Sequence, residues 1–130
     1  VAIKFAPALK ELVSTWQGVC DIDVKISPAL KKIITADARL SMCVNEVLKE
    51  AISNAVRHGD ARHANISLTE IESGVVEVSV SNDGEPPRAS KHKGLGSAML
   101  DELALDWTLT YEPNVYQTVL IAHLPFSKQQ

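Results

Sequence analysis

The segment from Ala38 to His58 constrains the fold of this chain most, because its apolar residues recur at helical spacing over about six turns. Asp37, just before it, is suited to accept backbone N–H groups as an N-cap, and Gly59 is expected to end the helix. The pattern predicts one long helix that buries a single stripe. The stripe consists of Val44, Leu48, Ala51, Ile52 and Ala55.

Shorter patterns flank this helix and indicate a sheet. Alternation of apolar and polar residues predicts five strands, at Cys20–Ile26, Ala64–Leu68, Val76–Val80, Trp107–Tyr111 and Tyr116–Leu124. Helical spacing predicts further helices at Phe5–Trp16 and Leu95–Leu105, and a short helical turn at Leu30–Ile34. The order favours an α/β (α+β) sandwich: a mixed, mostly antiparallel five-stranded sheet, covered on one face by about three helices.

Composition narrows the class of protein. The 130 residues, 45% of them hydrophobic, suit one domain with a real core, and no apolar run approaches a membrane span. Thirteen Lys and Arg against sixteen Asp and Glu argue against a nucleic-acid binder. Cys20 and Cys43 lie in apolar patterns, so we expect buried thiols and a cytoplasmic setting. The chain begins at Val1, and we expect residues 1–130 to be the C-terminal part of a longer protein.

A row of polar residues lies on the long helix. Glu50, Asn54 and His58 are each four residues apart, so each step advances about 40° and all three share one flank, beside the buried stripe. A Glu and an Asn held there could bind a hydrated Mg²⁺, which prefers oxygen ligands. The Glu could also orient or deprotonate a nucleophile. An ordinary solvated face would show the same spacing.

A second polar residue lies at the end of a strand. Asn82 shares a face with Val78 and Val80, so its amide is expected on the buried side, where it needs partners. An adenine edge, with an amine donor and a nitrogen acceptor, matches that amide. Gly84 permits a tight turn and a close ligand approach. A strand that simply ends in an Asn-Asp-Gly turn is the alternative.

A third feature is the segment Lys93-Gly94-Leu95-Gly96-Ser97, between a charged loop and a helix. Its glycines would expose N–H groups at the helix N-terminus, which favours anions. Arg88 and Lys91 add positive charge beside it. A glycine-rich loop that leads into an ordinary helix explains the same residues. The segment is neither a Walker A loop nor a dinucleotide fingerprint.

Together and in this order, the pieces resemble the ATP-binding domain shared by sensor histidine kinases, gyrase, the ninety-kilodalton heat-shock chaperone and the mismatch-repair ATPase. The chain looks most like the catalytic domain of a bacterial sensor histidine kinase, over nearly its whole length. The motif E-x-x-x-N-A-x-x-H is met by Glu50, Asn54, Ala55 and His58. The second glycine motif is met by Gly94 and Gly96, and the last strand carries Thr118 before an ending in Leu-Pro.

The resemblance implies roles for these residues. Asn54 would ligate the Mg²⁺ that bridges the phosphates of ATP, and Glu50 would be the polar catalytic residue near the γ-phosphate. Arg57 or His58 could touch phosphate. Asn82, Asp83 and Gly84, together with Thr118, would line the adenine end of the pocket. Lys93, Gly94, Leu95 and Gly96 would bind the phosphates.

The chain departs from the family pattern at three places. The family's first glycine motif is D-x-G-x-G, and its Asp accepts a hydrogen bond from the adenine amine; in register that Asp is Asn82 and the last Gly is Pro86. Asp83 would take the role only after a one-residue slip, against which the strand alternation argues. The Gly before Thr118 is Gln117, and the lid, residues 85–93, is short.

Three functions follow from this sequence. The first is a module that binds ATP with Mg²⁺ and phosphorylates a histidine on a separate phosphoacceptor domain, upstream of a response regulator. The second is an anti-sigma-factor type serine kinase of the same fold. The third is a degenerate fold that binds a partner protein without ATP, which Asn82 and Pro86 keep open. The first is preferred, and neither nucleic-acid binding nor membrane insertion of the domain itself is expected.

Overall fold

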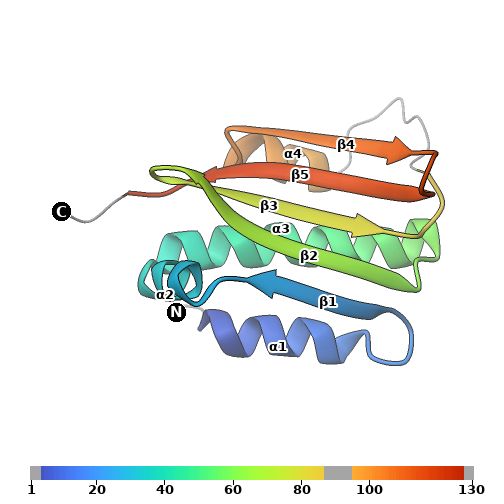
Figure 1. Ribbon diagram of the computed structural model, residues 1–130, viewed down its shortest axis with the longest axis horizontal. Helices are drawn as coiled ribbons and strands as arrows, with labels where there is room; N and C mark the ends of the chain where they lie inside the picture. The colour runs from blue at the N-terminus through green and yellow to red at the C-terminus, as the bar shows by residue number, and fades with distance from the viewer. Residues whose placement is uncertain (1–3, 87–94, 128–130) are drawn as a thin grey trace.

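The computed structural model describes residues 4–86 and 95–127. It contains a sheet of five strands with helices packed on one face (Figure 1). The helices are α1 (Phe5–Thr15), α2 (Pro28–Ala36), α3 (Ala38–Gly59) and α4 (Leu95–Leu103). The strands are β1 (Asp21–Ile26), β2 (His63–Glu72), β3 (Val75–Asn82), β4 (Asp106–Glu112) and β5 (Gln117–Pro125). The predicted α/β sandwich is therefore confirmed.

The sheet is mixed and mostly antiparallel, as the sequence indicates. Its strand order is β1-β2-β3-β5-β4, and only the β1–β2 pair is parallel. In β3 and β5 alternate residues are buried, so one face of the sheet meets the helices and the other faces outward. The central strands are thus β2, β3 and β5, and β4 forms an edge.

The core lies between this sheet and α3. The buried stripe of α3 includes Val44, Leu48 and Ile52, which are at most 1% exposed, and Val78 and Leu124 face it from β3 and β5 with no exposed surface. Figure 1 shows α3 running behind the middle of the sheet. Burial of such side chains contributes about 1.5–3 kcal/mol each, so the contact between α3 and the central strands stabilises the fold.

Two local predictions were wrong in detail. The segment predicted as a short helical turn at Leu30–Ile34 starts earlier: the Ser27 hydroxyl oxygen accepts the Leu30 N–H at 3.1 Å, and Pro28 takes the first helical position of α2. The short turn is therefore a nine-residue helix, which makes four helices among the described residues. α3 also extends one residue beyond the predicted His58: Gly59 is its last helical residue, and Asp60 adopts the left-handed conformation, with φ 53°, as the C-cap.

The remaining predicted elements are all present, although β2 runs to Glu72 instead of ending at Leu68 and α4 ends at Leu103 instead of Leu105. The Asp37 carboxylate caps α3 by accepting the Leu40 N–H at 2.9 Å.

Both cysteines are buried free thiols, as expected. Burial raises the pKa of the Cys20 thiol, and the carboxylates of Asp83 and Asp21 raise it further. Among the described residues, no helix combines the length and hydropathy needed to cross a membrane.

Candidate functional site

A cavity of about 660 Å³ lies between the C-terminal half of α3 and the sheet. Its wall on the α3 side is polar, and its floor comes from the last residues of β3 and the first of β5. Part of α4 and two residues of the edge strand β4 close it. The lining residues are Glu50, Ala51, Asn54, Ala55, Arg57, His58, Gly59, Val80, Asn82, Glu85, Pro86, Ser97, Leu100, Trp107, Leu109, Thr118 and Leu120.

The polar row on α3 lines this cavity. Glu50, Asn54 and His58 all contribute to the wall, and so does Arg57. The Asn54 amide nitrogen donates to Glu50 Oε1 at 3.0 Å. Because that contact fixes which end of the amide is the nitrogen, the Asn54 oxygen is left for another partner. Glu50 therefore holds the Asn54 amide with its oxygen unbound beside the cavity.

The described residues do not form a metal site made of protein side chains alone. Within residues 4–86 and 95–127, no three His, Cys, Asp or Glu side chains converge on one point. The oxygens that the cavity does offer, from Asn54 and Glu50, suit a hard cation that keeps most of its ligands from water and phosphate. The residues present therefore fit a magnesium ion that arrives with a polyphosphate.

The floor carries two buried polar side chains that lie directly opposite one another. Asn82 at the end of β3 pairs with Thr118 at the start of β5, and they are 7% and 6% exposed. Asn82 Oδ1 accepts the Gly84 N–H at 2.9 Å. The Thr118 hydroxyl is buried and has no hydrogen-bond partner. A buried polar atom without a partner costs about 1–3 kcal/mol, so a ligand that reaches it would gain that energy.

Apolar side chains surround these two polar groups. Val80 and Leu120 pair with each other two residues further along the same strands, on the same face, and Leu100 of α4 also lines the cavity. Trp107 and Leu109 line it from β4, where the Trp107 indole N–H donates to Asp101 at 2.8 Å. An apolar chamber with a few convergent polar groups is typical of a small-molecule site, and its apolar walls suit a flat heteroaromatic ring.

Gly59 and Gly84 allow the residues after β3 to lie against the end of α3. The Glu85 N–H donates to the Gly59 carbonyl at 2.8 Å. A Cβ on Gly84 would lie 2.8 Å from that carbonyl oxygen and 2.9 Å from Asn82 Oδ1. Gly84 itself is not among the cavity-lining residues. Its role in the structure is thus the close approach that fixes Asn82, rather than direct contact with the cavity.

Asp83 points away from the cavity. Its carboxylate accepts the N–H groups of Arg62 and His63 at 2.8 and 3.0 Å. Desolvation acts to raise the pKa of the Asp83 carboxyl, but the hydrogen bonds from these two amides and the nearby His63 ring outweigh it and lower the pKa below its ordinary value. The strand register therefore places Asn82, and not Asp83, on the floor.

The second glycine segment is only partly described. Lys93 and Gly94, as well as the neighbouring Arg88 and Lys91, lie outside the described residues. Leu95 and Gly96 begin α4, and Ser97 after them lines the cavity. The start of this helix is therefore beside the cavity.

Sequence reasoning missed most of the apolar lining. Val80, Leu100, Leu109 and Leu120 read only as core or strand residues, and Trp107 gave no functional signal. These residues meet only once the sheet places β4 next to β5. The alternation of Val80 with Asn82 was the one signal that could have found a lining residue.

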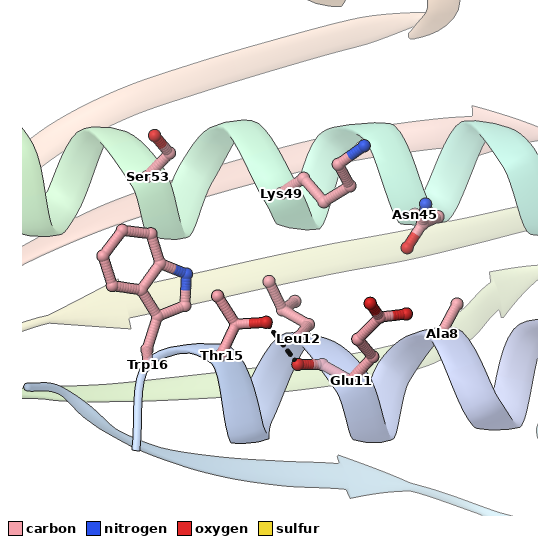
Figure 2. A pocket seen from close by; sticks show the side chains of 8 residues that line it. All are labelled: Ala8, Glu11, Leu12, Thr15, Trp16, Asn45, Lys49 and Ser53. Carbon is pink, nitrogen blue, oxygen red and sulfur yellow. Dashed lines mark hydrogen bonds between the residues drawn. The ribbon is translucent and has the colours of Figure 1, made fainter. Parts of the chain in front are cut away.

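A second, smaller groove of about 350 Å³ separates α1 from α3 (Figure 2). Glu11 and Trp16 line it from the side of α1. Asn45, Lys49 and Ser53 line it from the flank of α3 that does not line the larger cavity. Thr15 is tied to the α1 backbone by a bond to the Glu11 carbonyl. This groove lacks buried unpartnered polar atoms among the described residues, so the larger cavity is the stronger candidate.

Comparisons with known proteins give a match in structure but not in sequence. No family model matches the chain, and no curated protein matches it in sequence. The solved structure titled "Crystal Structure of ATP binding domain of PrrB from Mycobacterium Tuberculosis" is 18% identical with a TM-score of 0.67, and the match covers 98% of both chains.

Two longer proteins match as well. The blue-light activated histidine kinase EL346 of Erythrobacter litoralis is 19% identical with a TM-score of 0.66, and the match covers 98% of this chain and 47% of that kinase. The histidine kinase AdeS of Acinetobacter baumannii is 19% identical with a TM-score of 0.60, with 98% and 68% covered. This chain thus spans about half the length of the Erythrobacter kinase. At these identities the comparisons establish the fold: this chain folds like the ATP-binding domain of histidine kinases.

Proposed function

We propose that the larger cavity binds ATP with Mg²⁺, and that the domain donates the γ-phosphoryl group to a histidine on a separate phosphoacceptor domain in two-component signalling. The observation that carries this proposal is the Glu50–Asn54 pair. It lines the same cavity as the buried, unpartnered Thr118 hydroxyl. One part of the cavity therefore offers an oxygen to a cation, and another offers hydrogen bonds to a base.

The residues divide along the cavity according to their chemistry. The purine would lie between the apolar side chains, with its polar edge at Asn82 and Thr118. The phosphates would lie along the flank of α3 near Asn54, Arg57 and His58. The N-terminus of α4, which also borders the cavity, would favour their negative charge. When bound, Mg²⁺ would neutralise phosphate charge and fix the phosphate geometry. Glu50 would hold Asn54 and act near the γ-phosphate.

The phosphoacceptor is proposed to lie on another domain because the described histidines do not suit the role. His58 is in the cavity wall. His63, the first residue of β2, lies 3.9 Å from Asp21. His123 is on the outward face, 2.6 Å from Asp106 and 3.8 Å from Glu77. A response regulator would then receive the phosphoryl group from the acceptor domain, and a cytoplasmic location fits this role.

Calorimetry of the domain with ATP, with and without Mg²⁺, tests the nucleotide site. Binding should require Mg²⁺ for full affinity, and Asn54→Ala should weaken it by at least about tenfold, or about 1.4 kcal/mol. Asn45→Ala is the matched control, because Asn45 is on the same helix and lines the other groove. Equal loss in both variants, or no binding of ATP at millimolar concentration, contradicts the proposal.

The identity of the acceptor is tested in the full-length protein. After incubation with ATP and Mg²⁺, the phosphoryl group should be labile in acid and stable in base, as a phosphoramidate is. An acid-stable phosphate on a serine of a second protein would instead support the serine kinase.

A further inference from the structure

The floor of the cavity can form hydrogen bonds of either polarity. Its two polar side chains, Asn82 and Thr118, are neutral and pair across β3 and β5. An amide carries both an acceptor and two donor hydrogens, and a hydroxyl is a donor and an acceptor at once. No charge therefore fixes the direction of a hydrogen bond at this end of the cavity.

The hydrogen bonds of Asn82 show which of its atoms remain available to a ligand. The atom of Asn82 that faces the Gly84 N–H must be its oxygen, because a backbone N–H can only donate. One lone pair of that oxygen is thereby used, while the amide nitrogen has no acceptor among the described residues. The Thr118 hydroxyl is unpartnered and free to rotate. The floor thus offers a donor at least as readily as an acceptor.

A carboxylate at the position of Asn82 would behave differently. It only accepts, so it favours a 6-amino group and repels a 6-carbonyl oxygen. The adenine edge presents an amine donor at C6 and an acceptor at N1, whereas a 6-oxopurine presents an acceptor at C6 and a donor at N1. The Asn82–Thr118 pair can match the first edge, and after rotation of the hydroxyl it can match the second.

We propose that this cavity binds 6-oxopurine nucleoside triphosphates as well as ATP, and that Asn82 and Thr118 set this breadth. The inference rests on the proposed function, because it assigns the base that the same nucleotide site accepts. Unpaired polar groups are what allow a site to reject the wrong partner strongly. Asn82 and Thr118 can each form a hydrogen bond with either purine edge. Neither side chain is therefore left unpaired when a 6-oxopurine binds, and the site has no such means of rejecting it.

Calorimetry with Mg²⁺ and ATP, ITP or GTP tests the inference. ITP carries the hypoxanthine base, the simplest 6-oxopurine, and GTP adds a 2-amino group. The dissociation constants of the wild-type domain for ATP and ITP should agree within about tenfold. Asn82→Asp should shift their ratio by at least about tenfold toward ATP. Asp83→Asn should leave the ratio unchanged, because Asp83 faces Arg62 and His63 instead of the cavity.

The ratio of the ATP and ITP dissociation constants of the wild-type domain tests the proposal even if Asn82→Asp does not fold. Thr118→Val gives a further check: it should weaken ATP and ITP together and keep their ratio. A wild-type preference for ATP of more than about tenfold, or an unchanged ratio in folded Asn82→Asp, would overturn the inference while ATP binding stands. Failure of all three triphosphates to bind would overturn the proposed function as well.

Discussion

At the scale of single residues, the orientation of the Asn54 amide decides which of its atoms is available in the cavity. The spacing of Glu50 and Asn54 predicted that they share a flank of the helix. It did not predict that the Asn54 nitrogen would bond to Glu50 Oε1 at 3.0 Å and so free the oxygen. A hydrogen bond to a charged acceptor of this kind contributes about 1–3 kcal/mol. The Asn54 atom that remains available to a ligand is thus selected by Glu50 and not by the asparagine alone.

The contribution of that hydrogen bond is measured by two neutral variants of Glu50. Glu50→Gln keeps an oxygen that can accept from Asn54, and Glu50→Ala does not. We expect calorimetry to show about fivefold weaker binding of Mg²⁺–ATP by the Ala variant than by the Gln variant, which corresponds to about 1 kcal/mol. Glu46→Ala serves as control, because Glu46 pairs with Lys49 at 3.6 Å outside the cavity. Equal affinity of the Gln and Ala variants would mean that Glu50 does not position Asn54.

Asp83 gives a prediction about stability and pH. Its two backbone hydrogen bonds lower the pKa of the folded carboxyl below the ordinary 3.8. A lowered pKa stabilises the folded state above the unfolded pKa, and this contribution disappears as pH falls through the folded value. Asp83→Ala should therefore lower the free energy of unfolding by about 1 kcal/mol at pH 7. Urea denaturation between pH 7 and pH 3 should show the difference from wild type shrinking below about pH 4; a constant difference would contradict this account.

At the scale of elements, the start and the buried stripe of the long helix were predicted better than its end. Asp37 at the N-cap and the stripe from Val44 to Ala55 follow from local chemistry, which a sequence displays. The end of α3 does not, because Gly59 is retained in the helix for a contact with residues 84 and 85, far along the chain. A glycine near a helix end is an ambiguous signal when the reason for it is tertiary.

The two glycines at this contact should differ in their tolerance of alanine. A Cβ on Gly84 would come within 2.8 Å of the Gly59 oxygen, so Gly84→Ala should lower the free energy of unfolding by about 1–3 kcal/mol. A Cβ on Gly59 would meet Glu85 at 3.3 Å, and alanine favours the helix by about 0.5–1 kcal/mol. Gly59→Ala should therefore stay within about 1 kcal/mol of wild type. Thermal and urea unfolding would contradict this order if Gly59→Ala were the more damaging change.

At the scale of the whole molecule, the sequence predicted the layers but not the cavity. Alternation at β3 and β5 and the helical stripes were enough for a mixed sheet covered on one face. The cavity needs the strand order β1-β2-β3-β5-β4, which brings Trp107 and Leu109 of the edge strand into the same cavity as Asn82 and Thr118. Pairing across such distances along the chain is not encoded in any local pattern, so the apolar lining could only be found from the structure.

The same architecture provides the most direct test, since the two tryptophans lie in different places. Trp107 lines the cavity, and Trp16 lines the groove between α1 and α3 (Figure 2). Mg²⁺–ATP should be titrated while the emission of Trp16→Phe, which retains only Trp107, and of Trp107→Phe, which retains only Trp16, is recorded. We predict a saturable change in Trp107 emission that needs Mg²⁺, and none in Trp16 emission. A saturable change carried by Trp16, or a Trp107 signal that stays constant while calorimetry shows binding, would contradict the placement of the nucleotide in this cavity.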